Sequence, residues 1–224
     1  MNRIAKVEID DRIRQSCPGY RLLLVECDVE NTAPPAELKH ELEALSRSFK
    51  DLFKIEDIAH RPGIAATRAI YKALGKDPNR YRPSQEQMMR RIVRDLGLYE
   101  ISAIVDAGNL LSLLTGYSVG AFDADKVVGD TISIGVGMKD EPYEGIGRGP
   151  LNVEGLPIVR DGLGGIGTPT SDNERTKTSP STTRLLMTIH MFGEDMPIAD
   201  TIDNATRILR DYCAATDIDL RIIS

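Results

Sequence analysis

The chain has 224 residues, of which 41% are hydrophobic and 28% charged, a composition typical of a globular protein able to bury a substantial core. Its formal net charge of −6 at pH 7 argues against a protein that is basic throughout. The sequence contains no apolar run of about 18 residues, so it predicts no helical membrane span.

The cysteines and histidines are few and dispersed. Cys17, Cys27 and Cys213 lack the close pairing of zinc ligands and are odd in number, which is typical of reduced thiols in a cytoplasmic protein. With only three histidines in the chain, a histidine-rich metal site is not expected. We therefore predict neither a metal nor a cofactor.

The first 83 residues alternate between strand and helix patterns. Strands are predicted over 4–9 and 20–29, separated by a turn at Cys17-Pro18-Gly19. Pro34-Pro35 opens a helix that runs to about Lys54, and a second helix follows Arg61-Pro62-Gly63 and ends before Gly75.

The remaining residues continue this mixed pattern. Ser84 and Gln87 have the spacing of a capping box, which predicts that Ser84 caps a helix ending at Gly97. Further helices are predicted from 101 to about 115 and from 198 to 215, and strands over 131–137, 156–159, 184–192 and 220–223. No internal repeat or long linker separates these pieces.

A polar stripe runs along the predicted helix that begins near Ile101. Its members lie at steps of four, three and three and therefore share one face of the helix: Ser102, Asp106, Asn109 and Ser112. Because apolar residues flank this stripe, we interpret it as the wall of a pocket. The alternative is a packed helix with one solvated edge.

The segment 162–167 has the glycine spacing G-x-G-x-x-G. The sequence Thr168-Pro169-Thr170-Ser171 that follows does not begin a helix, so a dinucleotide site is not predicted. The glycines either expose backbone N–H groups to a ligand or serve a loop that needs positive φ. Residues 171–183 are polar and predict a mobile loop, either a flap beside a pocket or an idle surface segment.

Positive charge is concentrated between Arg61 and Arg94, where nine Lys or Arg residues stand against two acidic ones. Such a patch can hold a phosphate backbone even on an acidic protein. The predicted RNA-binding residues are Arg61, Arg68, Lys72, Arg80, Tyr81, Arg82, Arg90 and Arg91. The alternative is a solvated helix face paired with the acidic stretch before it.

Three short sequence motifs resemble those of a known family. They are Val105-Asp106-Ala107-Gly108-Asn109, Ala121-Phe122-Asp123-Ala124-Asp125-Lys126 and Gly162-Leu163-Gly164-Gly165. In order and rough spacing they resemble the B3/B4 module of the phenylalanyl-tRNA synthetase beta subunit, which hydrolyses mischarged tyrosyl-tRNA. The likeness runs from about Ser84 to Thr216. The chain is therefore similar to a free-standing version of that module.

The resemblance implies an α+β fold, a layered sheet-and-helix sandwich, with residues 84–224 as the B3/B4-like domain and 1–83 as an N-terminal αβ extension. It also implies tRNA or aminoacyl-tRNA as the partner and editing of mischarged aminoacyl-tRNA in trans as the activity. The substrate-binding residues that it suggests are Asn109, Asp106, Gly120, Gly164 and Gly165. Asparagine offers donors and acceptors, and glycine amides can stabilise an oxyanion.

The chain departs from the family pattern at two functional positions. Gly120 stands where the family has a histidine, and Thr188 stands where it has a glutamate. The loss removes the expected acid–base groups, although His190 lies on the same strand face as Thr188. We keep Thr188 and His190 as catalytic candidates, and a binding module without turnover as the alternative function.

Overall fold

The computed structural model describes residues 4–224 and contains two four-stranded sheets covered by helices. The helices are α1 (Asp11–Ser16), α2 (Ala36–Leu52), α3 (Pro62–Ala73), α4 (Ser84–Val93), α5 (Ala103–Thr115) and α6 (Ile198–Cys213). The strands are β1 (Lys6–Ile9), β2 (Arg21–Asp28), β3 (Ser118–Asp123), β4 (Thr131–Val136), β5 (Glu144–Gly145), β6 (Gly149–Pro150), β7 (Pro157–Asp161), β8 (Gly164–Gly167), β9 (Arg184–Met191) and β10 (Thr216–Ile223). Short 3₁₀ helices occupy Ile58–His60, Ala124–Lys126 and Glu174–Thr176.

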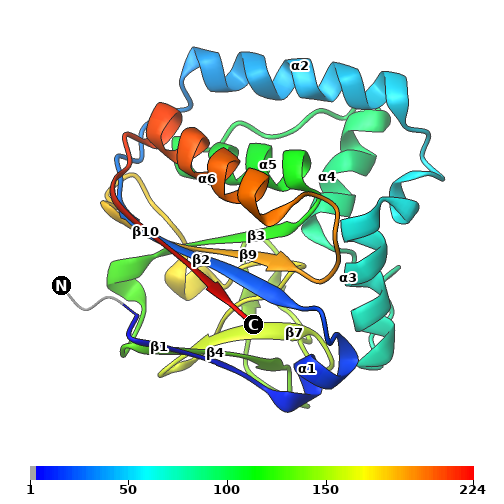
Figure 1. Ribbon diagram of the computed structural model, residues 1–224, viewed down its shortest axis with the longest axis vertical. Helices are drawn as coiled ribbons and strands as arrows, with labels where there is room; N and C mark the ends of the chain where they lie inside the picture. Colours follow the sequence, from blue (N-terminus) through cyan, green and yellow to red (C-terminus); the bar gives the residue numbers. More distant parts are fainter. Residues whose placement is uncertain (1–3) are drawn as a thin grey trace.

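The elements form three layers (Figure 1). The upper sheet has the strand order β10-β2-β9-β3, and the lower sheet has the order β1-β4-β7-β8. In Figure 1, α2, α5 and α6 lie above the upper sheet, and the lower sheet lies beneath it. The predicted α+β sandwich of sheets and helices is confirmed.

Alternation along the strands creates a core on each side of the upper sheet. Leu22, Leu24 and Phe122 face the lower sheet, whereas Leu23 and Val25 face the helices. Because both faces of β2 are covered, its run of apolar residues is buried throughout. A third, smaller core joins α2, α3, α4 and α5.

Strand β2 links the two predicted parts of the chain. It pairs antiparallel with β9 on one side and with β10 on the other, so it lies inside the upper sheet. Strand β1 likewise pairs with β4 in the lower sheet. Residues before Ser84 therefore share one core with those after it, and a domain boundary at 83/84 stays a prediction.

Two local expectations were wrong. Pro83, not Ser84, is the N-cap of α4, and no side chain caps that helix. Segment 171–183 is packed rather than loose, since Thr176 and Thr182 are buried. The glycine run is part turn and part strand: residues 162–163 form the turn between β7 and β8, Gly164 has a φ of 139°, and Gly164–Gly167 is strand β8.

Candidate functional site

Asn109 lies at the wall of a groove. Ser102 caps α5 by accepting a hydrogen bond from the N–H of Val105, and Gly116 ends the helix in the left-handed conformation with φ of 75°. Half-buried Asn109 then faces a cavity of about 300 Å³ bounded by α4, α5, residues 97–101, the β5–β6 hairpin and the turn at 170–171. We call this cavity the Asn109 groove. No group in residues 4–224 hydrogen-bonds the Asn109 amide, so its donors and acceptor can serve a ligand.

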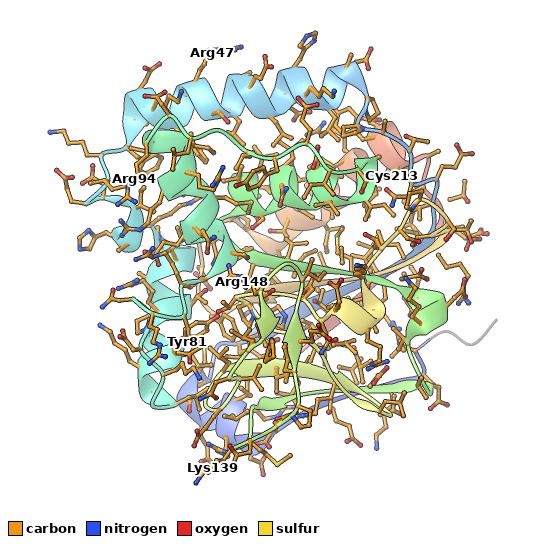
Figure 2. The ribbon with its side chains drawn as sticks, turned by 180° about the vertical axis from the view of Figure 1, so that it is seen from behind. Arg47, Tyr81, Arg94, Lys139, Arg148 and Cys213 are labelled. Atoms are coloured by element: carbon orange, nitrogen blue, oxygen red, sulfur yellow. The ribbon has the colours of Figure 1, made fainter. Side chains whose placement is uncertain are left out.

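Two arginines line the same groove. Arg91 donates to the carbonyls of Leu96 and Gly97, and its guanidinium carbon lies 4.3 Å from the ring centre of Tyr99. Arg148 comes from the β5–β6 hairpin and donates to the Gln87 side chain at 3.0 Å (Figure 2). Because neither arginine has a carboxylate partner within 4 Å in the described chain, the groove keeps a positive potential.

The other members of the polar stripe have different surroundings. Ser102 is the helix cap, and Ser112 is buried and donates to the carbonyl of Tyr117 at 2.6 Å. Asp106 is buried, accepts the N–H of Ile101 at 3.2 Å and lines a different cavity. Of the four residues in the polar stripe, Asn109 is therefore the one that lines the Asn109 groove.

Gly164 and Gly165 do not line the Asn109 groove. The N–H of Gly164 donates to the Asp161 carboxylate at 3.2 Å. A Cβ at Gly165 would lie 2.7 Å from Ile158 and 2.8 Å from Tyr143, so this glycine serves close packing in the core. The two glycines therefore do not share a groove with Asn109, although the resemblance suggested all three as substrate-binding residues.

Gly120 faces a polar cluster between the two sheets that the sequence did not reveal. A Cβ on Gly120 would lie 2.9 Å from the Thr188 hydroxyl and 3.1 Å from an Asp172 carboxylate oxygen. A Cβ on Gly167 would lie 3.1 Å from that same oxygen. We call Gly120, Gly167, Asp172 and Thr188 the Asp172 cluster. Gly120 and Thr188 come together because they are cross-strand partners on β3 and β9.

The Asp172 carboxylate and the Thr188 hydroxyl are poorly satisfied. Oδ2 of Asp172 accepts the N–H of Ala121 on the free edge of β3 at 3.1 Å, while Oδ1 has no hydrogen-bond partner in residues 4–224. The Thr188 hydroxyl is buried and also lacks a partner there. Burial raises the pKa of Asp172 to about 7, although the Ala121 N–H opposes this effect. The carboxyl group can therefore exchange a proton near neutral pH.

Asp172 was missed because it lies in a segment predicted to be mobile. Its position could have indicated a role, because Asp172 lies five residues after Gly167 in the segment that was interpreted either as a flap beside a pocket or as a surface segment. Ser171, the preceding residue, lines the Asn109 groove, so the groove and the Asp172 cluster are adjacent along the chain.

His190 is enclosed in an aromatic stack. Its Nδ1 is 2.8 Å from the Tyr20 hydroxyl, and its ring stacks with Phe192 at a centroid distance of 5.7 Å. Burial lowers the pKa of His190 to about 4, so the ring is neutral at pH 7. These contacts enclose His190 in the core, and its catalytic role stays a prediction.

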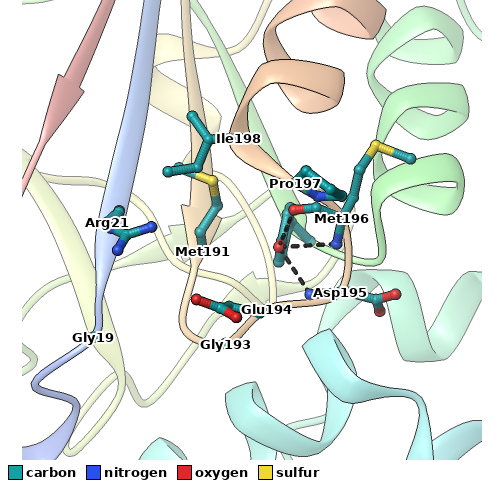
Figure 3. Close-up of a pocket in the computed structure, with 10 residues that line it drawn as sticks. Gly19, Arg21, Met191, Gly193, Glu194, Asp195, Met196, Pro197 and Ile198 are labelled. Carbon is teal, nitrogen blue, oxygen red and sulfur yellow. Dashed lines mark hydrogen bonds between the residues drawn. The ribbon is translucent and has the colours of Figure 1, made fainter.

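Arg61, expected to contact RNA, holds helices together instead. Its guanidinium donates to Asp195 at 2.9 Å and to the carbonyls of Leu113 and Leu114 at 2.7 and 2.9 Å. Asp195 belongs to the loop beside a cavity of about 360 Å³ (Figure 3), in which the Tyr117 hydroxyl accepts the backbone N–H of Asp195. Arg61 is 10% exposed and is not free to meet a phosphate.

Glu86 forms ion pairs with three more of the predicted RNA-binding residues. This carboxylate is fully buried and lies within 4 Å of the guanidinium groups of Arg68, Arg82 and Arg90. These arginines are therefore paired, but with Glu86 from within the basic stretch and not with the acidic residues before it. Lys72 and Arg80 are exposed, and Tyr81 is half-buried with the Lys76 ammonium 3.8 Å from its ring centre.

Two other kinds of feature were sought in residues 4–224. No group of three or more His, Cys, Asp or Glu side chains is arranged to hold a metal ion. No helix within this range is long and apolar enough to cross a membrane.

The sequence profile of the B3/4 domain matches residues 66–212, which is more than half of the chain. The chain belongs to the B3/4 domain family. The match begins within α3, so it includes part of the predicted N-terminal extension. No curated protein matches the chain.

Among solved structures, the chain is similar to an N-terminal fragment of the phenylalanyl-tRNA synthetase beta subunit from Pyrococcus horikoshii. The identity is 12% and the TM-score is 0.47. The likeness covers 98% of this chain and 54% of that fragment, so the chain spans about half of the fragment's length.

Proposed function

We propose that this B3/4 domain protein binds tRNA, that the Asn109 groove receives the aminoacylated end, and that the neighbouring Asp172 cluster supports hydrolysis of a mischarged ester in trans. The observation that carries the proposal is the geometry of the Asp172 cluster: the Asp172 carboxylate has one oxygen without a hydrogen-bond partner in residues 4–224 and lies beside the buried, unpartnered Thr188 hydroxyl. Burial raises the pKa of Asp172 to about 7, which suits this carboxyl group to proton transfer. The proposal implies a cytoplasmic location, where tRNA is charged.

The groove supplies groups suited to the end of an RNA strand. Arg91 and Arg148 offer guanidinium groups that can pair with phosphate, and the exposed ring of Tyr99 offers one face to a base. The Asn109 amide can hold a carbonyl oxygen or a ribose hydroxyl. Exposed Lys72 and Arg80 on and beyond α3 extend the basic surface.

The chemistry assigned to the Asp172 cluster is ester hydrolysis by water. As the water oxygen attacks the ester carbonyl carbon, the Asp172 carboxylate accepts one of its protons. The bond between that carbon and the ribose oxygen then breaks, and Asp172 returns the proton to the ribose oxygen. The products are a free amino acid and a tRNA with a free hydroxyl. The Thr188 hydroxyl can donate to the water or to the developing oxyanion.

A binding module without turnover is the second candidate, and one observation favours it. The Phe122 ring lies 2.8 Å from a Cβ position on Gly120 and 2.5 Å from one on Gly167. The space between these glycines is therefore occupied by an aromatic ring. On this alternative, RNA binds at the groove and no ester reaches Asp172.

Deacylation of tyrosine-charged tRNA-Phe and of other aminoacyl-tRNAs tests the proposal. We expect Asp172→Asn to slow deacylation about 100-fold or more, because it removes the proton acceptor. The same substitution at the exposed turn residue Asp140 is the matched control and should leave the rate unchanged. RNA affinity should be equal in both variants.

Three results separate the candidates. Hydrolysis that depends on Asp172 supports the proposal. Salt-sensitive RNA binding with every ester left intact supports the binding module. If the protein neither binds RNA nor cleaves an ester, both candidates are contradicted.

A further inference from the structure

Asp106 lines a groove that is separate from the Asn109 groove. It lies three residues before Asn109 on α5, yet it lines a cavity of about 340 Å³ between α2 and residues 97–100, which we call the Asp106 groove. The side chain is at the floor of this cavity, because only 1% of Asp106 is exposed. Residues 98 and 99 line both this groove and the Asn109 groove and separate the two.

The carboxylate of Asp106 is the one charge lining this groove that has no ion-pair partner in the described chain. The other charged side chains that line it each have an opposite charge within 4 Å. The pairs are Lys39 with Glu100, Arg47 with Glu43, and Lys50 with Asp95. Asp106 Oδ1 accepts the N–H of Ile101 at 3.2 Å, and Oδ2 accepts no hydrogen bond from residues 4–224. A buried charge in this condition favours a cationic ligand.

Three apolar side chains contribute to the walls of the groove. Leu42 comes from α2, whereas Leu98 and Tyr99 come from the segment before α5. The Tyr99 side chain is 68% exposed, so its ring can lie against a bound molecule. Apolar side chains beside one unpaired carboxylate fit an organic cation with an apolar body better than a bare metal ion, which needs several oxygen ligands.

We propose that the Asp106 groove binds a primary ammonium group carried on an aromatic or apolar body. The ammonium donates to Asp106, and the body lies between Leu42 and the Tyr99 ring. This inference does not depend on the proposed function at the Asn109 groove.

Isothermal titration with 2-phenylethylamine and its neutral analogue 2-phenylethanol tests the site. We expect the wild-type protein to bind the amine at least about tenfold more tightly, because the alcohol cannot form a hydrogen bond between two charged groups. In Asp106→Asn, which retains an acceptor for the Ile101 N–H, the two affinities should become equal. Asp140→Asn, the same change at an exposed turn residue, is the matched control and should leave both affinities unchanged.

A pH series gives a second measurement on the unaltered protein. Burial raises the pKa of Asp106 to about 6, opposed by the Ile101 N–H, with Glu100 raising it further and Lys39 lowering it. The amine should therefore bind less tightly at pH 5 than at pH 7.5, because Asp106 becomes protonated. Glu43, Arg47, Lys50 and Asp95 also face the groove region, but each is already ion-paired.

Phenylalanine methyl ester distinguishes two sources of the ammonium. Tighter binding of the ester than of 2-phenylethylamine supports an amino-acid ester, and the reverse order supports a free amine. Equal affinity of wild type for the amine and the alcohol, or an amine affinity unaffected by Asp106→Asn, overturns the inference. Failure of the amine to bind at millimolar concentration overturns it as well, and leaves RNA binding at the other groove untouched.

Discussion

Asp172 and Thr188 approach the same point from different segments, a loop and a central strand. Their side-chain oxygens would lie 3.1 and 2.9 Å from a Cβ on Gly120. Strand pairing causes this arrangement, because Gly120 on β3 is directly opposite Thr188 on β9. The loop then brings Asp172 to the free edge of β3, where it accepts the Ala121 N–H.

Gly120→Ala should destabilise the protein by about 1–3 kcal/mol. The added methyl group would lie 2.8 Å from the Phe122 ring and 2.9 Å from the Thr188 hydroxyl, so both must move. Urea unfolding measures the change. Gly19→Ala is the control, because a Cβ there has no neighbour within 4 Å. Equal stability of the two variants would contradict the close packing at Gly120.

Asp172 should make the protein less stable as the pH rises from about 4 to about 7. Asp172 in the folded state loses its proton around a pKa of about 7, whereas an unfolded aspartate loses it around a pKa of about 3.9. Stability from this group is full below the unfolded pKa and disappears as the pH passes the folded pKa. Asp172→Asn, compared with wild type by urea unfolding, should gain at least about 1 kcal/mol between pH 4 and pH 8. A difference that does not change with pH would refute the raised pKa.

Arg61→Met should lower the free energy of unfolding by about 3–5 kcal/mol, because it leaves the largely buried Asp195 carboxylate without its ion-pair partner. It also removes the hydrogen bonds to the carbonyls at the end of α5. Thermal or urea unfolding measures this decrease. Lys72→Met is the control and should change stability by less than about 0.5 kcal/mol, because Lys72 is exposed. If the two variants are equally stable, the structural role of Arg61 is incorrect.

The double variant Arg91→Ala/Arg148→Ala should reduce the salt dependence of RNA binding. For single-stranded RNA, the slope of log K against log salt should fall in magnitude by about 1.4, or roughly 0.7 for each phosphate that an arginine no longer neutralises. Filter binding from about 50 to about 200 mM salt measures the slope. Lys139→Ala is the control, since Figure 2 shows Lys139 at the bottom of the molecule, away from Arg148 near its middle. An unchanged slope in the double variant would remove these arginines from the RNA site.

Local sequence signals determined the secondary structure and the family. Ser102 and Gly116 define α5 because a cap and a left-handed residue act through neighbouring backbone groups. The apolar run in β2 predicted a central strand, because a strand that is buried on both faces has apolar residues at successive positions. The three motifs that resemble the family are also local, because each is a single short segment of the chain.

Tertiary structure decided which of these residues form sites. Asp106 and Asn109 are only about 60° apart around α5, so periodicity placed them together, yet residues 98 and 99 separate them into two grooves. Arg61 is internal because Asp195, distant in sequence, reaches it. Asp172 lies beside Thr188 because loop packing and cross-strand register are long-range relationships, and residue spacing alone carries no information about them.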